Sequence, residues 1–223
     1  MHVRFKAFLI HLICSLVIGM LALGLVFGLW YPSPLHLALG VTSIFLLLLM
    51  VDVTLGPLLT LVVYNPNKKS LKIDLAVIVG LQIAALGYGL WTVSQGRPVW
   101  LVFNVDRFDL VQAYQVSESY RRTAKPEYQT NSWIGATVVA ARKPVDVDAQ
   151  STLIFESMRG IDLPVRPDLY VPYEEELDSI RSRALPLSDL KKYNQKELIE
   201  NVLAEWPDAT AYLPMMAKVK SMT

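Results

Sequence analysis

Three long apolar runs fill the first 95 residues of this 223-residue chain, and a mixed, more polar sequence follows them. The runs cover about residues 8–30, 35–64 and 73–93. A helix needs about 20 apolar residues to cross the hydrocarbon core of a bilayer, and each run is long enough. The sequence therefore predicts a membrane protein with three transmembrane α-helices in residues 1–95, followed by a small α/β (α+β) domain in residues 96–223.

Charge is distributed unevenly between these two parts, although the formal net charge is only +1. Residues 1–95 hold five of the 21 basic and two of the 20 acidic side chains, which leaves 16 basic and 18 acidic ones in residues 96–223. Nucleic-acid binding needs an excess of basic side chains to neutralise phosphates. The slightly acidic second part therefore argues against a nucleic-acid partner.

Residues 96–223 contain no histidine and no cysteine, because Cys14 and the three histidines all precede residue 37. This removes the commonest general base at neutral pH, the Ser–His and Cys–His nucleophile pairs and cysteine zinc sites. No phosphate-binding loop or metal-ligand spacing is present either. We expect no enzyme, no catalytic residue, no cofactor and no metal. A carboxylate pair, Asp106 with Asp109, remains an alternative, although such residues after a strand more often stabilise a turn.

Basic residues mark one side of the membrane. Arg4 and Lys6 precede the first run, three lysines lie between the second and third runs, and the link at residues 31–34 carries no charge. The positive-inside rule places both basic clusters in the cytoplasm. Three crossings then place residues 96–223 in the periplasm of a bacterial inner-membrane, multi-pass protein. The first run is longer than the apolar part of a signal peptide, so we expect it to be retained.

Small residues recur at helical spacing in the first and third runs. Gly24 and Gly28 lie four residues apart, and Gly80 and Ala84 do the same. Such spacing allows two helix backbones to approach closely. The three helices could pack on each other through these faces, a second copy of the chain could bind there, or the faces could receive a helix from another protein.

Asp52 is an ionisable residue deep inside the second run, and Gln82 is expected at a similar depth in the third. Such a residue is costly in a membrane and is a functional hypothesis by default. It could anchor a partner that carries a positive group, or it could hold the helices together through Gln82. The pair Gly56-Pro57 follows Asp52 and predicts a kink or break in the helix near residues 52–57.

Strand and helix signals alternate in the second part. We expect strands at residues 99–105, 135–141, 152–155 and 212–219. Helices are expected at residues 118–125 and 173–183, and a further helix after a capping box formed by Asn194 and Glu197. This pattern predicts a small α/β domain.

Several strings resemble the type IV pilin accessory proteins (the TfpX/TfpZ group). They are VDVTLGPLLTLVVY at 51–64, NPNKKSLKIDLAVI at 65–78, GRPVW at 96–100, FNVDRF at 103–108 and YLPMMAKV at 212–219. The resemblance implies a non-enzymatic inner-membrane factor, a chaperone or assembly modulator that supports pilin stability and pilus biogenesis. Its partners would be the major pilin, other pilus assembly proteins, the lipid bilayer and a second copy in a homo-oligomer.

The matching strings identify the positions that the resemblance makes worth testing. They are Asp52, Gly56, Pro57, Lys68, Lys69, Asp74, Arg97, Pro98, Asp106, Arg107 and Phe108. Members of the group usually continue with another strand beyond the equivalent of Thr223, so we expect a truncated chain with an unpaired sheet edge. Two other interpretations are a structural or sensor subunit of an envelope complex and a pilin-modifying membrane enzyme.

Overall fold

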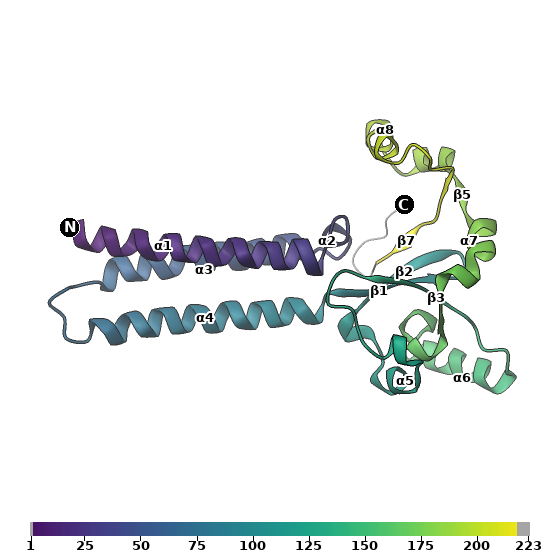
Figure 1. Cartoon of the computed structure of the whole chain (residues 1–223), viewed down its shortest axis with the longest axis horizontal. Helices are drawn as coiled ribbons and strands as arrows, with labels where there is room; N and C mark the ends of the chain where they lie inside the picture. Colours follow the sequence, from purple (N-terminus) through teal and green to yellow (C-terminus); the bar gives the residue numbers. More distant parts are fainter. Residues whose placement is uncertain (1, 218–223) are drawn as a thin grey trace. The chain divides into compact units, whose positions relative to one another are not determined.

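The computed structural model describes residues 2–217, and the chain divides into two compact units after Arg97 (Figure 1). The first unit is helical and the second contains the strands. Each unit has its own packing and is described separately below.

The first unit contains three long helices. The first is α1 (His2–Leu23), which continues as a π-helical segment at Gly24–Trp30; the others are α3 (Val41–Val63) and α4 (Leu71–Gln95). All three are long and apolar enough to cross a membrane, judged by length and composition alone. The prediction of three long apolar helices is therefore confirmed.

The second long helix begins later than predicted. A short helix, α2 (Leu35–Ala38), occupies the start of the second apolar run, and Gly40 then adopts a φ of 66° before α3 begins. Glycine adopts this left-handed conformation at little cost, so the chain can turn here. Of the kink or break predicted near residues 52–57, a break does not occur, because α3 runs continuously through Pro57. Proline removes only one hydrogen bond of the helix, and both Gly56 and Pro57 are buried.

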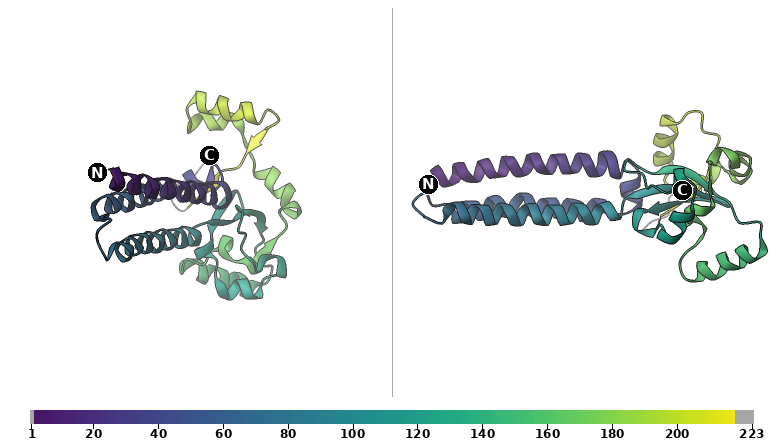
Figure 2. Two further views of the ribbon diagram at one scale, coloured as in Figure 1. Left: turned by 60° about the vertical axis from the view of Figure 1, so that its left-hand side comes forward. Right: turned by 60° about the horizontal axis from the view of Figure 1, so that its bottom comes forward.

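Helix α3 is the centre of the first unit, with α1 packed along it on one side and α4 on another (Figure 2). Gly89 of α4 faces Leu48 so closely that a Cβ would lie 2.2 Å from its Cδ1, whereas a Cβ at Gly19 of α1 would lie 3.4 Å from Val53, an ordinary contact distance. The Tyr31 hydroxyl donates a hydrogen bond of 2.8 Å to the Val93 carbonyl and ties the end of the π-helical segment to α4.

The second unit is built on a five-stranded mixed sheet with the order β4-β3-β1-β2-β7. Its strands are β1 (Pro98–Asn104), β2 (Arg107–Gln112), β3 (Thr137–Ala141), β4 (Tyr170–Val171) and β7 (Met215–Met216). The central β1 pairs antiparallel with β2 and parallel with β3. Two further short strands, β5 (Leu185–Pro186) and β6 (Ala211–Tyr212), pair with each other. The coarse prediction of an α/β domain is confirmed.

Short helices connect the strands of this unit. The α-helices are α5 (Glu118–Thr123), α6 (Val147–Met158), α7 (Leu177–Arg183) and α8 (Lys196–Glu205). The 3-10 segments are Ala113–Gln115, Pro126–Tyr128, Leu163–Val165, Pro167–Leu169, Tyr173–Glu176 and Leu187–Lys192. The helix predicted at 173–183 therefore begins with a 3-10 turn before α7.

Two local predictions in this unit are wrong: a strand and a capping box. The strand expected at residues 152–155 lies inside α6, whose first turn is capped by the Asp146 carboxylate accepting from the Ala149 amide at 2.9 Å. A short apolar run does not by itself distinguish a strand from a helix, and the cap decides in favour of the helix here. The capping box of Asn194 with Glu197 does not form, because the N-cap of α8 is Gln195 and makes no side-chain cap bond.

The last predicted strand is two separate short strands in the structure. β6 and β7 are interrupted at Leu213 and Pro214, and proline lacks the amide that a continuous strand would need. The remaining residues of that prediction, 218 and 219, lie outside the described residues.

Three aromatic rings form the centre of the core of the second unit. Trp100 meets Tyr128 and Tyr170 edge to face, with ring centroids 6.0 and 5.5 Å apart, and the two tyrosines are themselves 5.8 Å apart. Val99 and Val102 of β1 and Val139 of β3 belong to the same buried cluster. Burial raises the pKa of Tyr170, so its hydroxyl remains protonated and donates to the Pro164 carbonyl.

Replacing Trp100 with alanine tests this core. Its ring is 2% exposed, and truncation of a buried large aromatic side chain costs about 3–5 kcal/mol. We expect a marked fall in the unfolding midpoint of the second unit, measured by thermal denaturation of the detergent-solubilised protein. Trp206→Ala is the matched control, because that side chain is 68% exposed. Equal effects of the two variants would contradict the assigned core.

One ion-pair cluster joins the residue after β3 to the 3-10 segment Tyr173–Glu176. Arg142 lies 2.7 Å from a Glu176 carboxylate oxygen and 3.1 Å from one of Glu175. Hydrogen bonding to Arg142 lowers the pKa of Glu176 below its ordinary value of 4.5. A carboxyl whose pKa is lowered on folding stabilises the protein above its unfolded-state pKa, and this contribution disappears as pH falls through the folded-state pKa.

The variant Arg142→Gln should therefore lower Tm at pH 7, and the difference from the unsubstituted protein should shrink as pH falls below about 4.5. Arg159→Gln is the control, because Arg159 pairs only with Glu156 one helical turn away and is 76% exposed. Thermal melts between pH 3 and pH 7 provide the measurement. A Tm difference that stays constant across this range would count against the Arg142–Glu176 pair.

Candidate functional site

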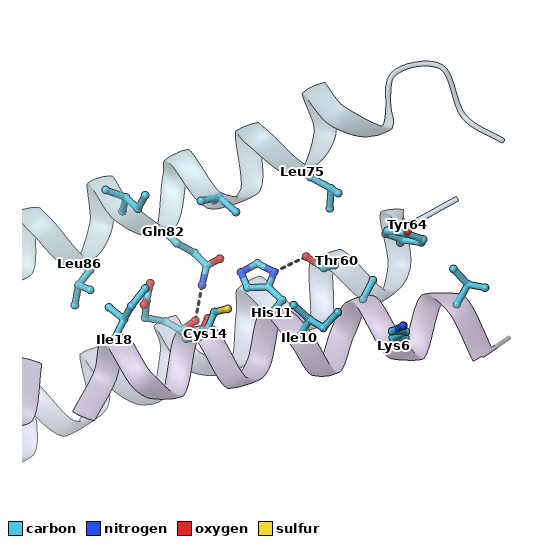
Figure 3. Close-up of a pocket in the computed structure, with 16 residues that line it drawn as sticks. Lys6, Ile10, His11, Cys14, Ile18, Thr60, Tyr64, Leu75, Gln82 and Leu86 are labelled. Carbon is cyan, nitrogen blue, oxygen red and sulfur yellow. Dashed lines mark hydrogen bonds between the residues drawn. The ribbon is translucent and has the colours of Figure 1, made fainter. Parts of the chain in front are cut away.

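A groove with a volume of about 710 Å³ opens in the helical unit between α1 and α4, above α3 (Figure 3). Its α1 wall includes Ile10, Cys14 and Ile18, and its α4 wall includes Leu75, Val79, Gln82, Ile83 and Leu86. Asp52, Thr60 and Tyr64 contribute from α3 and the residue after it. The groove exists because α1 and α4 each pack on α3 and leave space between them.

Most of the groove is apolar, but polar groups come together on its α3 side. His11 Nδ1 lies 2.6 Å from the Thr60 hydroxyl, a hydrogen bond that connects α1 to α3. The Gln82 side-chain amide of α4 donates a bond of 2.9 Å to the backbone carbonyl of Asp52. Figure 3 shows His11 and Gln82 pointing into the groove from opposite helices.

The side-chain oxygen of Gln82 is the unusual atom of this site. It is buried, and it accepts no hydrogen bond from any residue that the structure describes. Leaving a buried acceptor unsatisfied costs roughly 1–3 kcal/mol. One buried acceptor beside the groove is therefore left without a hydrogen-bond donor in the described part of the chain.

Gly56 makes room for the Gln82 side chain. A Cβ at Gly56 would lie 2.0 Å from both the amide carbon and the oxygen of Gln82. Three residues that the sequence singled out, Asp52, Gly56 and Gln82, are thus brought together by α3 and α4. Pro57 is buried beside them.

The other small residues singled out by sequence take no part in close packing. A Cβ at Gly24, Gly28 or Gly80 would meet nothing within 4 Å, and Ala84 is exposed. These four positions lie on open surfaces of the helical unit as described, whereas the close approaches occur at Gly56 and Gly89.

The motif residues of the second unit stabilise a tight hairpin between β1 and β2. Asp109 accepts from the Asn104 side-chain amide at 2.8 Å and from Arg107 Nε at 3.3 Å. Arg107 also lies 3.7 Å from Asp106, and Phe108 packs against Phe103 with ring centroids 5.7 Å apart. Because both carboxylate oxygens of Asp109 are engaged, the geometry favours a structural role over a carboxylate pair with Asp106.

Arg97 lies at the end of the helical unit and is buried. Its guanidinium donates a bond of 2.7 Å to the Ser94 carbonyl, near the C-terminus of α4. Cations are favourable at that end of a helix because the last carbonyls carry partial negative charge. Arg97 thus helps to end α4.

Sequence reasoning missed the polar and apolar residues of α1 that line the groove. Ala7, His11, Cys14 and Ile18 recur at spacings of three and four, which places them on one helical face. This spacing of three and four residues was the signal available in the sequence. It was hard to recognise because nearly all residues of the helix are apolar. No group of three or more metal-ligating side chains lies together among residues 2–217.

Comparison with known proteins assigns the family. The sequence profile described as Fimbrial assembly protein FimB matches residues 1–40. The fimbrial assembly protein of serogroup I from Dichelobacter nodosus is 32% identical over 191 residues, which cover 84% of this chain and 74% of that protein. The chain belongs to the FimB family of fimbrial assembly proteins.

Two further relatives of this FimB-family protein come from the same organism. The serogroup E1 fimbrial assembly protein is also 32% identical over 191 residues, covering 84% of this chain and 74% of the relative. The protein of serogroups C1 and C2 is 39% identical over 99 residues, covering 44% of this chain and 76% of the relative. No solved structure matches. The resemblance to pilus accessory proteins is confirmed, and the segment matched by the FimB profile includes α1, one wall of the groove.

Alanine at Gly56 tests the contact beneath the groove. The added methyl group must displace the Gln82 amide and break its bond to Asp52, whereas Gly80→Ala meets open space and gains helix propensity. We expect Gly56→Ala to be less stable than Gly80→Ala by about 1 kcal/mol or more, measured by thermal unfolding in detergent.

Double-mutant analysis makes this test specific. Combining Gly56→Ala with Gln82→Ala should cost less than the sum of the two single effects, because Gln82→Ala removes the side chain that clashes. Strict additivity would show that the two residues do not share a contact.

Proposed function

We propose that this FimB-family protein is a non-enzymatic accessory factor of type IV pilus assembly that acts as a chaperone or assembly modulator for pilin in the bacterial inner membrane. The observation that carries the proposal is the groove on the helical unit, with its polar floor at Asp52 and Gln82. The relatives named as fimbrial assembly proteins supply the biological context.

The proposed orientation follows from length and charge. Three helices of membrane-spanning length give an odd number of crossings. The basic residues at Arg4, Lys6 and in the loop of residues 65–70 favour a cytoplasmic location for the N-terminus and for that loop. The second unit then lies in the periplasm, on the side where a pilin head would be found.

The two units would bind different parts of the pilin, which is the proposed client. A membrane-resident pilin has one apolar helix and a periplasmic head, so the helical unit would bind the helix and the second unit the head. Arg97, Asp106, Arg107 and Phe108 are the proposed contact positions near or within the second unit. Binding must be modest in free energy, because the client has to be released to the growing filament.

A non-enzymatic role is supported by the chemistry of the second unit. Residues 98–223 contain no histidine or cysteine, and the Asp109 carboxylate is engaged by Asn104 and Arg107 in the β1–β2 hairpin. These groups stabilise a turn. Helix packing in a membrane, by contrast, relies on close contact and hydrogen bonding, which the groove offers.

A deletion strain tests the proposed function. We expect less pilin in the inner membrane and fewer surface pili, with both restored by the intact gene, measured by immunoblotting and by shearing pili from cells. Pilin should also co-purify with the tagged protein from membranes solubilised in mild detergent.

Two results would favour the other interpretations. Unchanged pilin and pilus levels in the deletion strain, without co-purification, would point to a structural or sensor subunit of an envelope complex. Loss of a covalent pilin modification in Asp106→Asn, at unchanged protein level, would point to an enzyme.

A further inference from the structure

We propose that, in the client-free protein, the groove between α1 and α4 binds one anionic phospholipid of the cytoplasmic leaflet. An acyl chain lies along the groove, and the phosphate lies at Lys6 and Tyr64. The proposal rests on the proposed function, which places the protein in the inner membrane, and it adds a lipid ligand that a client helix has to displace.

The length of the groove matches one leaflet of a bilayer. Lys6 and Ile18 of α1 both line it and lie twelve residues apart, which corresponds to about 18 Å of helix. Asp52 and Tyr64, which line it from the α3 side, are also twelve residues apart. One leaflet measures about 15 Å without its headgroups and about 20 Å with them. The groove therefore has the depth of a single phospholipid.

Two hydrogen-bond donors lie at the outer end of the groove. The Lys6 ammonium and the Tyr64 hydroxyl both belong to this end (Figure 3), and neither has a hydrogen-bond or ion-pair partner among residues 2–217. Lys69 and Lys72, just beyond this end of α3, add two further positive charges. Basic pockets between transmembrane helices on the cytoplasmic side bind anionic lipid headgroups. The charge at this end therefore favours a phosphate.

Between its two ends the groove suits an acyl chain. Its walls include Ile10 and Val79, and the polar groups along it are engaged within the protein: His11 bonds Thr60, and the Gln82 amide nitrogen bonds the α3 backbone. The volume of about 710 Å³ lies within the range of about 300–1,000 Å³ that is common for ligand sites. The apolar walls thus position the chain, and the charge at the outer end selects the headgroup.

A second copy of this chain fits the outer end poorly. All copies insert into the membrane in the same orientation, so a second copy brings its own Arg4 and Lys6 to the same membrane face. Like charges repel each other, whereas a lipid phosphate neutralises the lysine. An anionic phospholipid is therefore the occupant that the charge of the groove favours.

Binding of phosphatidylglycerol to the full-length protein, purified without pilin, tests the headgroup site. Native mass spectrometry during a lipid titration in detergent provides the measurement. We expect Lys6→Gln to weaken the apparent affinity at least fivefold. Arg4→Gln is the matched control and should change the affinity less than twofold, because Arg4 carries the same charge two residues earlier and does not line the groove.

Two other ligands define the source of the phosphate. Phosphatidylcholine with the same acyl chains should bind at least threefold more weakly than phosphatidylglycerol, because its headgroup carries no net charge. Inorganic phosphate should not displace phosphatidylglycerol, because it has no acyl chain to occupy the groove. Displacement by inorganic phosphate would identify an anion site and would contradict the lipid site.

A bulky side chain in the groove tests the position of the acyl chain. Val79 lines the groove, whereas Val77 lies two residues earlier on α4, is 54% exposed and does not line it. We expect Val79→Trp to reduce phosphatidylglycerol binding at least fivefold and Val77→Trp to leave it unchanged.

Cys14 reports on the groove without any substitution, because it is the only cysteine and lines the groove. We expect phosphatidylglycerol to slow alkylation of Cys14 by a water-soluble maleimide at least threefold. This measurement decides the matter even if a substituted protein fails to fold.

Three results would overturn the proposal. They are equal losses of affinity in Lys6→Gln and Arg4→Gln, equal binding by the two tryptophan variants, and alkylation of Cys14 that phosphatidylglycerol does not slow. Because these measurements need no pilin, such a failure leaves the proposed function standing. Unchanged pili in a deletion strain, without co-purification of pilin, would remove the proposed function and not the lipid site.

Discussion

The contact between Gln82 and Asp52 is the point on which the helical unit depends. It joins α4 to α3 through a single side-chain hydrogen bond of 2.9 Å, and it requires glycine at position 56 because a Cβ there would overlap the Gln82 amide. On the other side of α3, His11 and Thr60 tie α1 in the same manner. Along this part of the unit both neighbours are thus held to α3 rather than to each other, which leaves the groove between them.

Much of the helical unit could be predicted from sequence, because apolar length alone predicts helices of membrane-spanning size. The residues at the close contacts between helices were harder to predict. Gly24, Gly28 and Gly80 have the spacing of a packing face, yet the close approaches occur at Gly56 and Gly89. Glycine spacing reports where a backbone could approach, and the rotation of each helix about its axis decides whether it does.

The second unit shows where local signals fail. The β1 strand follows from a continuous apolar run that begins at Pro98 and ends at the turn at Val105, whereas the mixed order of the sheet could not be read from that run. The apolar segment at residues 152–155 has no such boundaries, and it lies within a helix whose N-terminus is capped by the Asp146 carboxylate accepting from the Ala149 amide. Short apolar segments are decided by their neighbours, so their assignment needs the capping geometry as well as the pattern.

Only part of the candidate site could be predicted from the sequence, because the packing of the helices decides which residues meet. Asp52 stands out in sequence because a charge inside an apolar run is rare, and Gln82 is recognisable by its depth. Thr60 and Cys14 carry no such signal, because both residue types are tolerated within a transmembrane helix, and His11 lies near the start of its apolar run, where a polar side chain is less unusual. Only the packing of α1 and α4 on α3 brings them to the same groove.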